Sequence, residues 1–176
     1  MKIVGIIGSL RKESIHRQIF SEYQTISKDL FDLEEGSIAR LPVYDGEDSN
    51  NPIVAKLQQQ ILDADGVIFF TPEYNYSVPG GLKNAIDWLS RCDPQPLFDK
   101  PAAIIGASPG NAGTARMQYH LRQIAVFMNL HVMNKPEVMI AQAMSKISDG
   151  VITDQSTRDF LGRHAQAFAE FTNKIN

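Results

Sequence analysis

Cysteine is nearly absent from this sequence, and so are long runs of one residue class. A single cysteine, Cys92, occurs among 176 residues, which excludes an intrachain disulfide and a cysteine-based zinc site. No apolar run approaches the roughly 20 residues of a membrane span. The opening run MKIVGIIGSL is interrupted by Gly5 and Gly8 and lacks the small-residue cleavage site of a signal peptide. We therefore expect a cytoplasmic protein with no membrane segment.

Concentrated positive charge is lacking too. Lys and Arg number 17 against 20 Asp and Glu, for a formal net charge of -3, and no long basic run offers a surface to nucleic acid or an anionic membrane. The histidines stand at positions 16, 120, 131 and 164 without the spacing of metal ligands. Neither an HExxH motif nor a nucleophile elbow is present. We expect no metal site and no catalytic side chain.

Short apolar segments alternate five times with amphipathic segments along the chain. The apolar segments predict strands at residues 2–7, 30–33, 66–71, 102–107 and 131–137, the last with an end made uncertain by Pro136. Helical spacing predicts helices at residues 16–27, 52–64, 114–128 and 154–174, and one that opens at residues 79–81. This alternation predicts a single α/β domain over residues 1–176, a doubly wound parallel sheet with helices on both faces.

Three loops follow the carboxyl ends of predicted strands, where such folds bind ligands. The first, residues 8–14, leads into a helix whose free N–H groups and dipole favour a phosphate. Ser9 and Ser14 add hydroxyl donors, and Arg11 can add a charge-assisted hydrogen bond of roughly 1.5–3 kcal/mol. The loop is neither GxGxxG nor a Walker motif, which favours a terminal monophosphate. The equally weighted alternative is that Ser14 only caps the helix and that Arg11 is a solvated side chain.

The second and third loops have the composition of a ring-binding site. Pro72 and Pro79 stiffen a segment that contains Glu73, two tyrosines and an asparagine, which can hydrogen-bond the edge of a planar heterocycle and flank its ring. Residues 108–113 carry two glycines that allow close backbone approach. The alternatives are a connector with surface tyrosines and a turn without a ligand.

Two motifs resemble the bacterial NAD(P)H-dependent FMN reductases of flavodoxin-like fold, especially the quinone and chromate reductase branch. They are residues 8–14 and the run PEYNYSVPGGLKNAIDW at 72–88, and residues 118–123 and 134–137 extend the match. The resemblance implies a five-stranded sheet of order 2-1-3-4-5 and bound FMN. It also implies NADPH or NADH as hydride donor and a small electron acceptor: a quinone, with azo compounds, free flavin or chromate as further substrates.

The resemblance also assigns cofactor-binding positions. It matches Ser9, Arg11 and Ser14 to the phosphate. It matches Glu73, Tyr74, Asn75 and Tyr76 to the loop along the isoalloxazine, and Ser108 to the loop beyond its other edge. The expected cofactor-binding set also includes Leu10, Ile15, His16, Pro72 and Gly110. His16 stands where such proteins usually have asparagine. A histidine donates more strongly when protonated, so we expect it to make FMN affinity pH-dependent.

The sequence offers several candidate residues for subunit contacts and for the choice between NADPH and NADH. Relatives commonly form dimers that pair into tetramers, and Arg116, Tyr119 and Glu137 are candidate interface residues, with an intrachain ion pair as the alternative. Recognition of a 2′-phosphate needs a suitably positioned cation, and the candidates are Arg17, Lys83, Arg91 and Arg116.

Two other functions stay open, a flavodoxin-type electron carrier and an FMN-free regulatory module. The modest net charge of -3 disfavours the carrier.

Overall fold

The apolar segments assemble into one parallel sheet. A computed structural model describes residues 1–47, 51–148 and 150–176. Its strands are β1 (Lys2–Ile7), β2 (Asp32–Glu35), β3 (Gly66–Phe70), β4 (Pro101–Ala107), β5 (His131–Val132) and β6 (Val138–Ile140). The order is β2-β1-β3-β4-β5, with β6 also paired to β4, and every pairing is parallel. The predicted strand order is confirmed.

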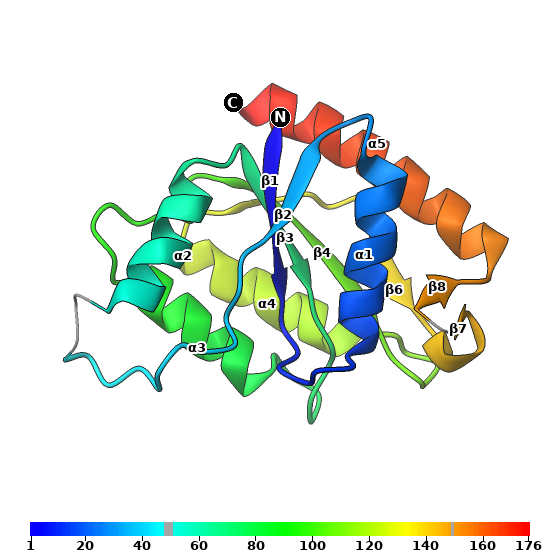
Figure 1. Ribbon diagram of the computed structural model, residues 1–176, viewed down its shortest axis with the longest axis horizontal. Helices are drawn as coiled ribbons and strands as arrows, with labels where there is room; N and C mark the ends of the chain where they lie inside the picture. Colours follow the sequence, from blue (N-terminus) through cyan, green and yellow to red (C-terminus); the bar gives the residue numbers. More distant parts are fainter. Residues whose placement is uncertain (48–50, 149) are drawn as a thin grey trace.

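Within the described residues, five α-helices cover the two faces of this sheet (Figure 1). Those in the described part of the chain are α1 (Ile15–Ser27), α2 (Pro52–Leu62), α3 (Gly80–Leu89), α4 (Ala115–Phe127) and α5 (Gln155–Ile175). On β1, Ile3 and Ile7 belong to the core beneath α1 and α5, whereas Val4 and Ile6 belong to the core beneath α2, α3 and α4. Successive strand residues point to opposite faces, so β1 is apolar throughout because both faces are covered.

The second strand begins two residues later than predicted. The N–H groups of Leu30 and Phe31 donate to the carbonyl of Ser27 at 2.8 and 3.1 Å. These bonds extend the end of α1, so both residues are unavailable for the ladder. Pairing with β1 begins at Asp32, opposite Lys2.

The predicted strand at residues 131–137 is wrong in extent. β5 stops at Val132, the N–H of Met133 makes one further bond to Ala102 (2.8 Å), and the chain returns to β4 only at Val138, opposite Ile105. Pro136 lies in the interruption and has no N–H to donate to a ladder.

A small unit between β6 and α5 was not predicted. It consists of a short 3-10 helix, η1 (Ala143–Ser145), and an antiparallel hairpin of β7 (Ile147–Ser148) and β8 (Val151–Ile152). The N–H groups of Gln142 and Ala143 donate to the carbonyls of Gly110 and Ser108, each at 3.0 Å. This unit is therefore fastened to the third loop. Of the helices in the described ranges, none has the length and apolar character needed to cross a membrane.

Candidate functional site

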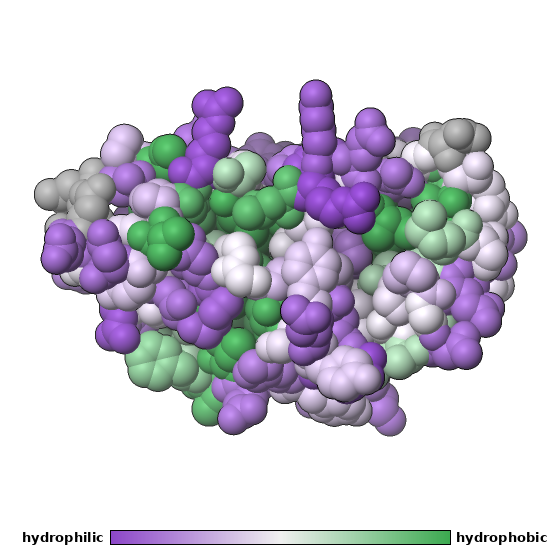
Figure 2. All heavy atoms as spheres, turned by 90° about the horizontal axis from the view of Figure 1, so that it is seen from below, coloured by the Kyte–Doolittle hydropathy of each residue, from purple (hydrophilic) through white to green (hydrophobic). Residues whose placement is uncertain are grey.

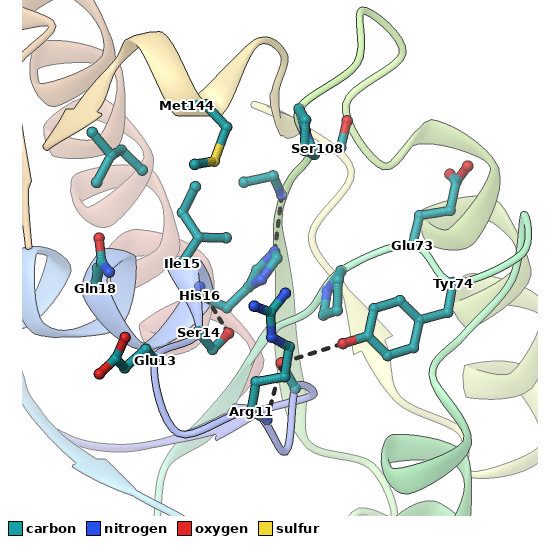
Figure 3. Close-up of a pocket in the computed structure, with 15 residues that line it drawn as sticks. Arg11, Glu13, Ser14, Ile15, His16, Gln18, Glu73, Tyr74, Ser108 and Met144 are labelled. Carbon is teal, nitrogen blue, oxygen red and sulfur yellow. Dashed lines mark hydrogen bonds between the residues drawn. The ribbon is translucent and has the colours of Figure 1, made fainter.

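A cavity of about 270 Å³ opens where the three loops meet, at the carboxyl ends of β1, β3 and β4 (Figure 3). Figure 2 faces this edge of the sheet and shows hydrophilic side chains around smaller apolar areas. The predicted site residues that line the cavity are Ser9, Arg11, Ser14, Ile15, His16, Pro72, Glu73, Tyr74 and Ser108. The structure thus brings together residues from three loops far apart in sequence.

The N-terminus of α1 forms one end of the cavity. Ser14 caps the helix, and its Oγ accepts the N–H of His16 at 3.2 Å. A hydroxyl can accept and donate at once, so this cap leaves the Ser14 proton available to a ligand. The N–H of Ile15, in the first turn, has no acceptor in the described part of the chain. Both groups suit an anion.

Arg11 supplies the positive charge of this end. Its side chain is exposed and forms no ion pair with any described residue. In Figure 3 the guanidinium points into the middle of the site, and the Glu13 carboxylate lies on the opposite side of Ser14. Arg11 therefore remains free to bind an anion.

His16 lies at the inner wall and is only 2% exposed. Its Nε2 is 3.2 Å from the N–H of Ala107, from which it accepts. Burial lowers the pKa of His16 to about 4. The ring is thus uncharged at neutral pH, and the charged donor considered from the sequence becomes a neutral one, acting through Nδ1.

Tyr74 joins the first loop to the second. Its hydroxyl lies 3.4 Å from Ser9 Oγ, and its backbone forms two hydrogen bonds with Ser77, at 3.0 and 2.9 Å. Between them Asn75 and Tyr76 have φ values of 49° and 67°, so the tip is a two-residue turn with both central residues left-handed. Neither Asn75 nor Tyr76 lines the cavity, because the turn projects beyond it, and Tyr76 is 70% exposed.

Glu73 holds the second loop against α4. Its carboxylate, 5% exposed, accepts from Arg116 Nε at 2.7 Å and from the N–H of Met117 at 3.1 Å. The Arg116 guanidinium in turn lies 3.7 Å from the centre of the Tyr76 ring, and Ser77 Oγ bonds His120 Nδ1 at 2.7 Å. Glu73 lines the cavity, and its two carboxylate oxygens both accept hydrogen bonds from α4. These bonds fix the second loop against that helix.

The third loop and the β6–α5 unit close the remaining side. The Ser108 N–H donates to the Ile140 carbonyl at 3.0 Å. Gly110 does not line the cavity, and a Cβ there would meet nothing closer than Ser108 Oγ at 4.0 Å. Leu10 also lies outside this cavity, where it contacts Gly81.

Several lining residues were not predicted: Glu13, Gln18, Ala107, Pro109, Met144 and Ile147. Glu13 and Pro109 lie within the predicted loops, Ala107 adjoins Ser108, and Gln18 lies two residues beyond His16. Met144 and Ile147 come from the unassigned segment after β6. Their spacing of three residues in an otherwise polar stretch was the available signal.

The candidate interface residues have partners within the chain. Arg116 pairs with Glu73, and Glu137 lies 3.9 Å from Arg122. Tyr119 is 62% exposed. Both ion pairs form within the chain, as in the alternative given above. An interface through Arg116, Tyr119 and Glu137 stays a prediction.

Three of the four cations that are candidates for binding a 2′-phosphate already form ion pairs with carboxylates of the chain. Arg17 binds Glu35 through two hydrogen bonds of 2.6 and 2.9 Å, Lys83 binds Asp87 at 2.6 Å, and Arg116 binds Glu73. The fourth, Arg91, lies 5.9 Å from the centre of the Phe127 ring.

Comparison with known proteins places the chain in a family. Residues 1–145 match the family model described as NADPH-dependent FMN reductase. The chain belongs to this family. A quinone reductase from Escherichia coli strain K12 is 45% identical to this family member, and the alignment covers 99% of this chain and 97% of the relative. An NAD(P)H-dependent FMN reductase from Pseudomonas aeruginosa is 42% identical, with the same coverage.

A solved structure agrees with the assignment to the NADPH-dependent FMN reductase family. The flavoenzyme FerB from Paracoccus denitrificans, an NAD(P)H:acceptor oxidoreductase, superposes with a TM-score of 0.90 at 34% identity. The match covers 99% of this chain and 98% of FerB. The family consists of oxidoreductases, so the expectation of an enzyme is confirmed, as is the flavodoxin-like fold.

Proposed function

We propose that the cavity binds FMN and that the protein uses NADPH or NADH to reduce quinones and similar small acceptors. The observation that carries this proposal is the pairing of two unlike ends in one cavity. One end offers the unpaired Arg11 and the α1 N-terminus, and the other offers a proline-stiffened wall with Tyr74. A phosphate suits the first end, and the edge of a flat ring suits the second.

The phosphate end has the donors that a dianion requires. Ser9 Oγ, the Arg11 guanidinium, the Ser14 hydroxyl and the Ile15 N–H all border it. His16 adds a neutral N–H at most, because its pKa is about 4. FMN affinity should therefore vary little with pH near neutrality through this residue.

The ring end is built from backbone and apolar surface. Pro72 and Tyr74 from the second loop and Ser108 from the third would border the isoalloxazine, with Met144 beside the mouth. Glu73, which lines the cavity, and Arg116 would keep the second loop in place beside the cofactor. Asn75 and Tyr76, at the exposed tip of the turn, would face the entering substrate.

FMN, when bound, supplies the hydride-transfer chemistry. The chain's residues would bind and orient it and shield it from water on the inner side. We assign no catalytic side chain, since His16 is too weakly basic to carry a proton at neutral pH. A quinone as acceptor is supported by the names of relatives, which include quinone reductases and a 2-hydroxy-1,4-benzoquinone reductase. Chromate, azo compounds and free flavin are further candidates.

The same proposal extends to assembly and location. We expect a homodimer or homotetramer with Arg116, Tyr119 and Glu137 at an interface, supported by the exposure of Tyr119. The ion pair of Arg116 with Glu73 and that of Glu137 with Arg122 would then compete with contacts across that interface. We expect the protein to act in the cytoplasm, where NADPH and NADH are generated.

Anaerobic absorbance tests the proposed reaction. The protein is loaded with FMN, one equivalent of NADPH or NADH is added, and benzoquinone follows. We expect the yellow flavin absorbance to fade with pyridine nucleotide and to return with quinone. Persistent absorbance after NADPH and NADH would indicate an electron carrier instead. A chain that takes up no FMN would indicate a module that does not use flavin.

A further inference from the structure

A second cavity lies on the other side of the first loop from the flavin site. It has a volume of about 350 Å³ and is lined by Arg11, Lys12 and Arg17, with the hydroxyls of Ser9 and Ser37. A third cavity, of about 380 Å³, contains Arg40 and Lys56. The second and third cavities share Glu35, Ser37 and Ala39. We call their union the β2 groove, because it follows the carboxyl end of β2.

The β2 groove concentrates uncompensated positive charge. Glu35 is the one carboxylate among the described residues that line it, and both its oxygens accept from Arg17, at 2.6 and 2.9 Å. The remaining cations, Arg11, Lys12, Arg40 and Lys56, form no ion pair within the described ranges. The whole chain carries a net charge of -3. Lys12, Arg40 and Lys56 remain unpaired even when Arg11 binds the FMN phosphate, and three such cations in an acidic protein favour a ligand with more than one negative charge.

By its place at the end of the second strand, the groove is analogous to a nucleotide subsite of another doubly wound fold, the Rossmann fold. In dinucleotide-binding α/β folds, the carboxyl end of the second strand reads the adenosine ribose: a carboxylate accepts from a 2′-hydroxyl, and a nearby arginine accommodates a 2′-phosphate. Here the last residue of β2 is Glu35, and Arg17 already occupies its carboxylate. Since the cations beside it are unpaired, the charges favour the phosphate.

We propose that the β2 groove binds the adenosine half of NADPH, with its 2′-phosphate between Arg40 and Lys56, and that the groove thereby selects NADPH over NADH. The inference rests on the proposed function and specifies its reductant. Arg11 borders both the flavin cavity and the groove, so one continuous surface leads from one to the other. Arg40 and Lys56 line only the groove.

Two nucleotides that differ by one phosphate test the proposal. Adenosine 2′,5′-bisphosphate carries the 2′-phosphate of NADPH, and 5′-AMP lacks it. Each is titrated by calorimetry into the FMN-loaded protein, the Arg40→Gln/Lys56→Gln variant and the control Lys28→Gln/Lys174→Gln. The control removes two exposed cations that have no ion pair with a described residue and lie outside the groove.

We expect the bisphosphate to bind the parent and the control more tightly than 5′-AMP does, and the groove variant to lose about fivefold to tenfold of that affinity. The ratio of KM for NADPH to KM for NADH should rise by a similar factor in the groove variant alone. Equal binding of both nucleotides to the parent, or no change in the groove variant, would overturn the inference and leave the flavin reductase standing. Failure of the parent to take up FMN would overturn the proposed function and this inference with it.

Discussion

The polar side chains around the flavin cavity differ in how far they are already committed to protein partners. Glu73 is nearly buried and accepts two hydrogen bonds from α4, whereas Arg11 forms no ion pair with a described residue. A charge that is already paired has little binding energy left for a ligand, and an unpaired exposed charge has most of it. Residue by residue, the site therefore divides into groups that shape the cavity and groups that can bind.

Two histidines are buried in an uncharged state. Burial lowers the pKa of His16 to about 4 and that of His164 to about 3. His164 Nδ1 lies 2.7 Å from the hydroxyl of Tyr23, between α1 and α5, and burial raises the pKa of that hydroxyl. Burial stabilises the neutral form of both rings, so protonating either ring would destabilise the folded state.

These histidines predict loss of stability in mild acid. In the unfolded chain both rings gain a proton below about pH 6.5, while in the folded chain His16 stays neutral down to about pH 4. The unfolded state then binds more protons, so the free energy of unfolding falls as the pH drops through this window. For His16 the loss is roughly 3 kcal/mol at most. Urea unfolding between about pH 7.5 and pH 4.5 measures it.

The matched variant is His16→Asn, because asparagine keeps a polar group and does not titrate. We expect its stability to fall less steeply with decreasing pH than that of the parent. Identical slopes for the two proteins would show that His16 is not a buried neutral group.

At the scale of elements, the contact between β4 and the start of α4 is the tightest near the site. A Cβ on Gly106 would lie 1.7 Å from Thr114 Oγ1, which also accepts a hydrogen bond from Gln118 at 3.1 Å. Thr114 is fully buried. The threonine has no space into which to retreat, so only glycine fits at this point of β4.

Gly106→Ala should therefore push α4 away from the sheet. Overpacking of this kind costs about 1–3 kcal/mol, and in a domain of this size each kcal/mol lowers Tm by roughly 2–4 °C. The control is Gly80→Ala in the first turn of α3, where a Cβ would meet nothing within 4 Å. There alanine should stabilise by about 0.5–1 kcal/mol. Equal Tm values for the two variants, measured by thermal unfolding, would contradict the packing argument.

Elements were predictable where one physical effect dominated. β1, β3 and β4 are buried on both faces, so their apolar runs identify them without further context. The break after β5 depends on Pro136 and on a return to β4 that only the assembled sheet defines. The β7–β8 hairpin has strands of two residues each, too short to show any periodicity.

At the scale of the whole molecule, the meeting of three loops was predictable and their internal contacts were not. Carboxyl ends of parallel strands share one edge of a sheet, so loops 8–14, 71–79 and 108–113 had to converge. The sequence could not tell which cation would pair with which carboxylate, since that depends on tertiary geometry. Hence the sequence did not reveal that Glu73, a predicted flavin contact, pairs with Arg116, or that Arg17, a candidate for the 2′-phosphate, pairs with Glu35.

The central claim is that Arg11 and the α1 N-terminus hold the phosphate of FMN, and the most direct test compares FMN with riboflavin, which lacks that phosphate. Dissociation constants for both are measured by fluorescence quenching with the parent, Arg11→Gln and the control Lys28→Gln. We predict that Arg11→Gln weakens FMN binding by about tenfold or more and leaves riboflavin binding unchanged. A parent that binds both flavins equally, or an Arg11→Gln variant that keeps the parent's preference for FMN, would contradict the account.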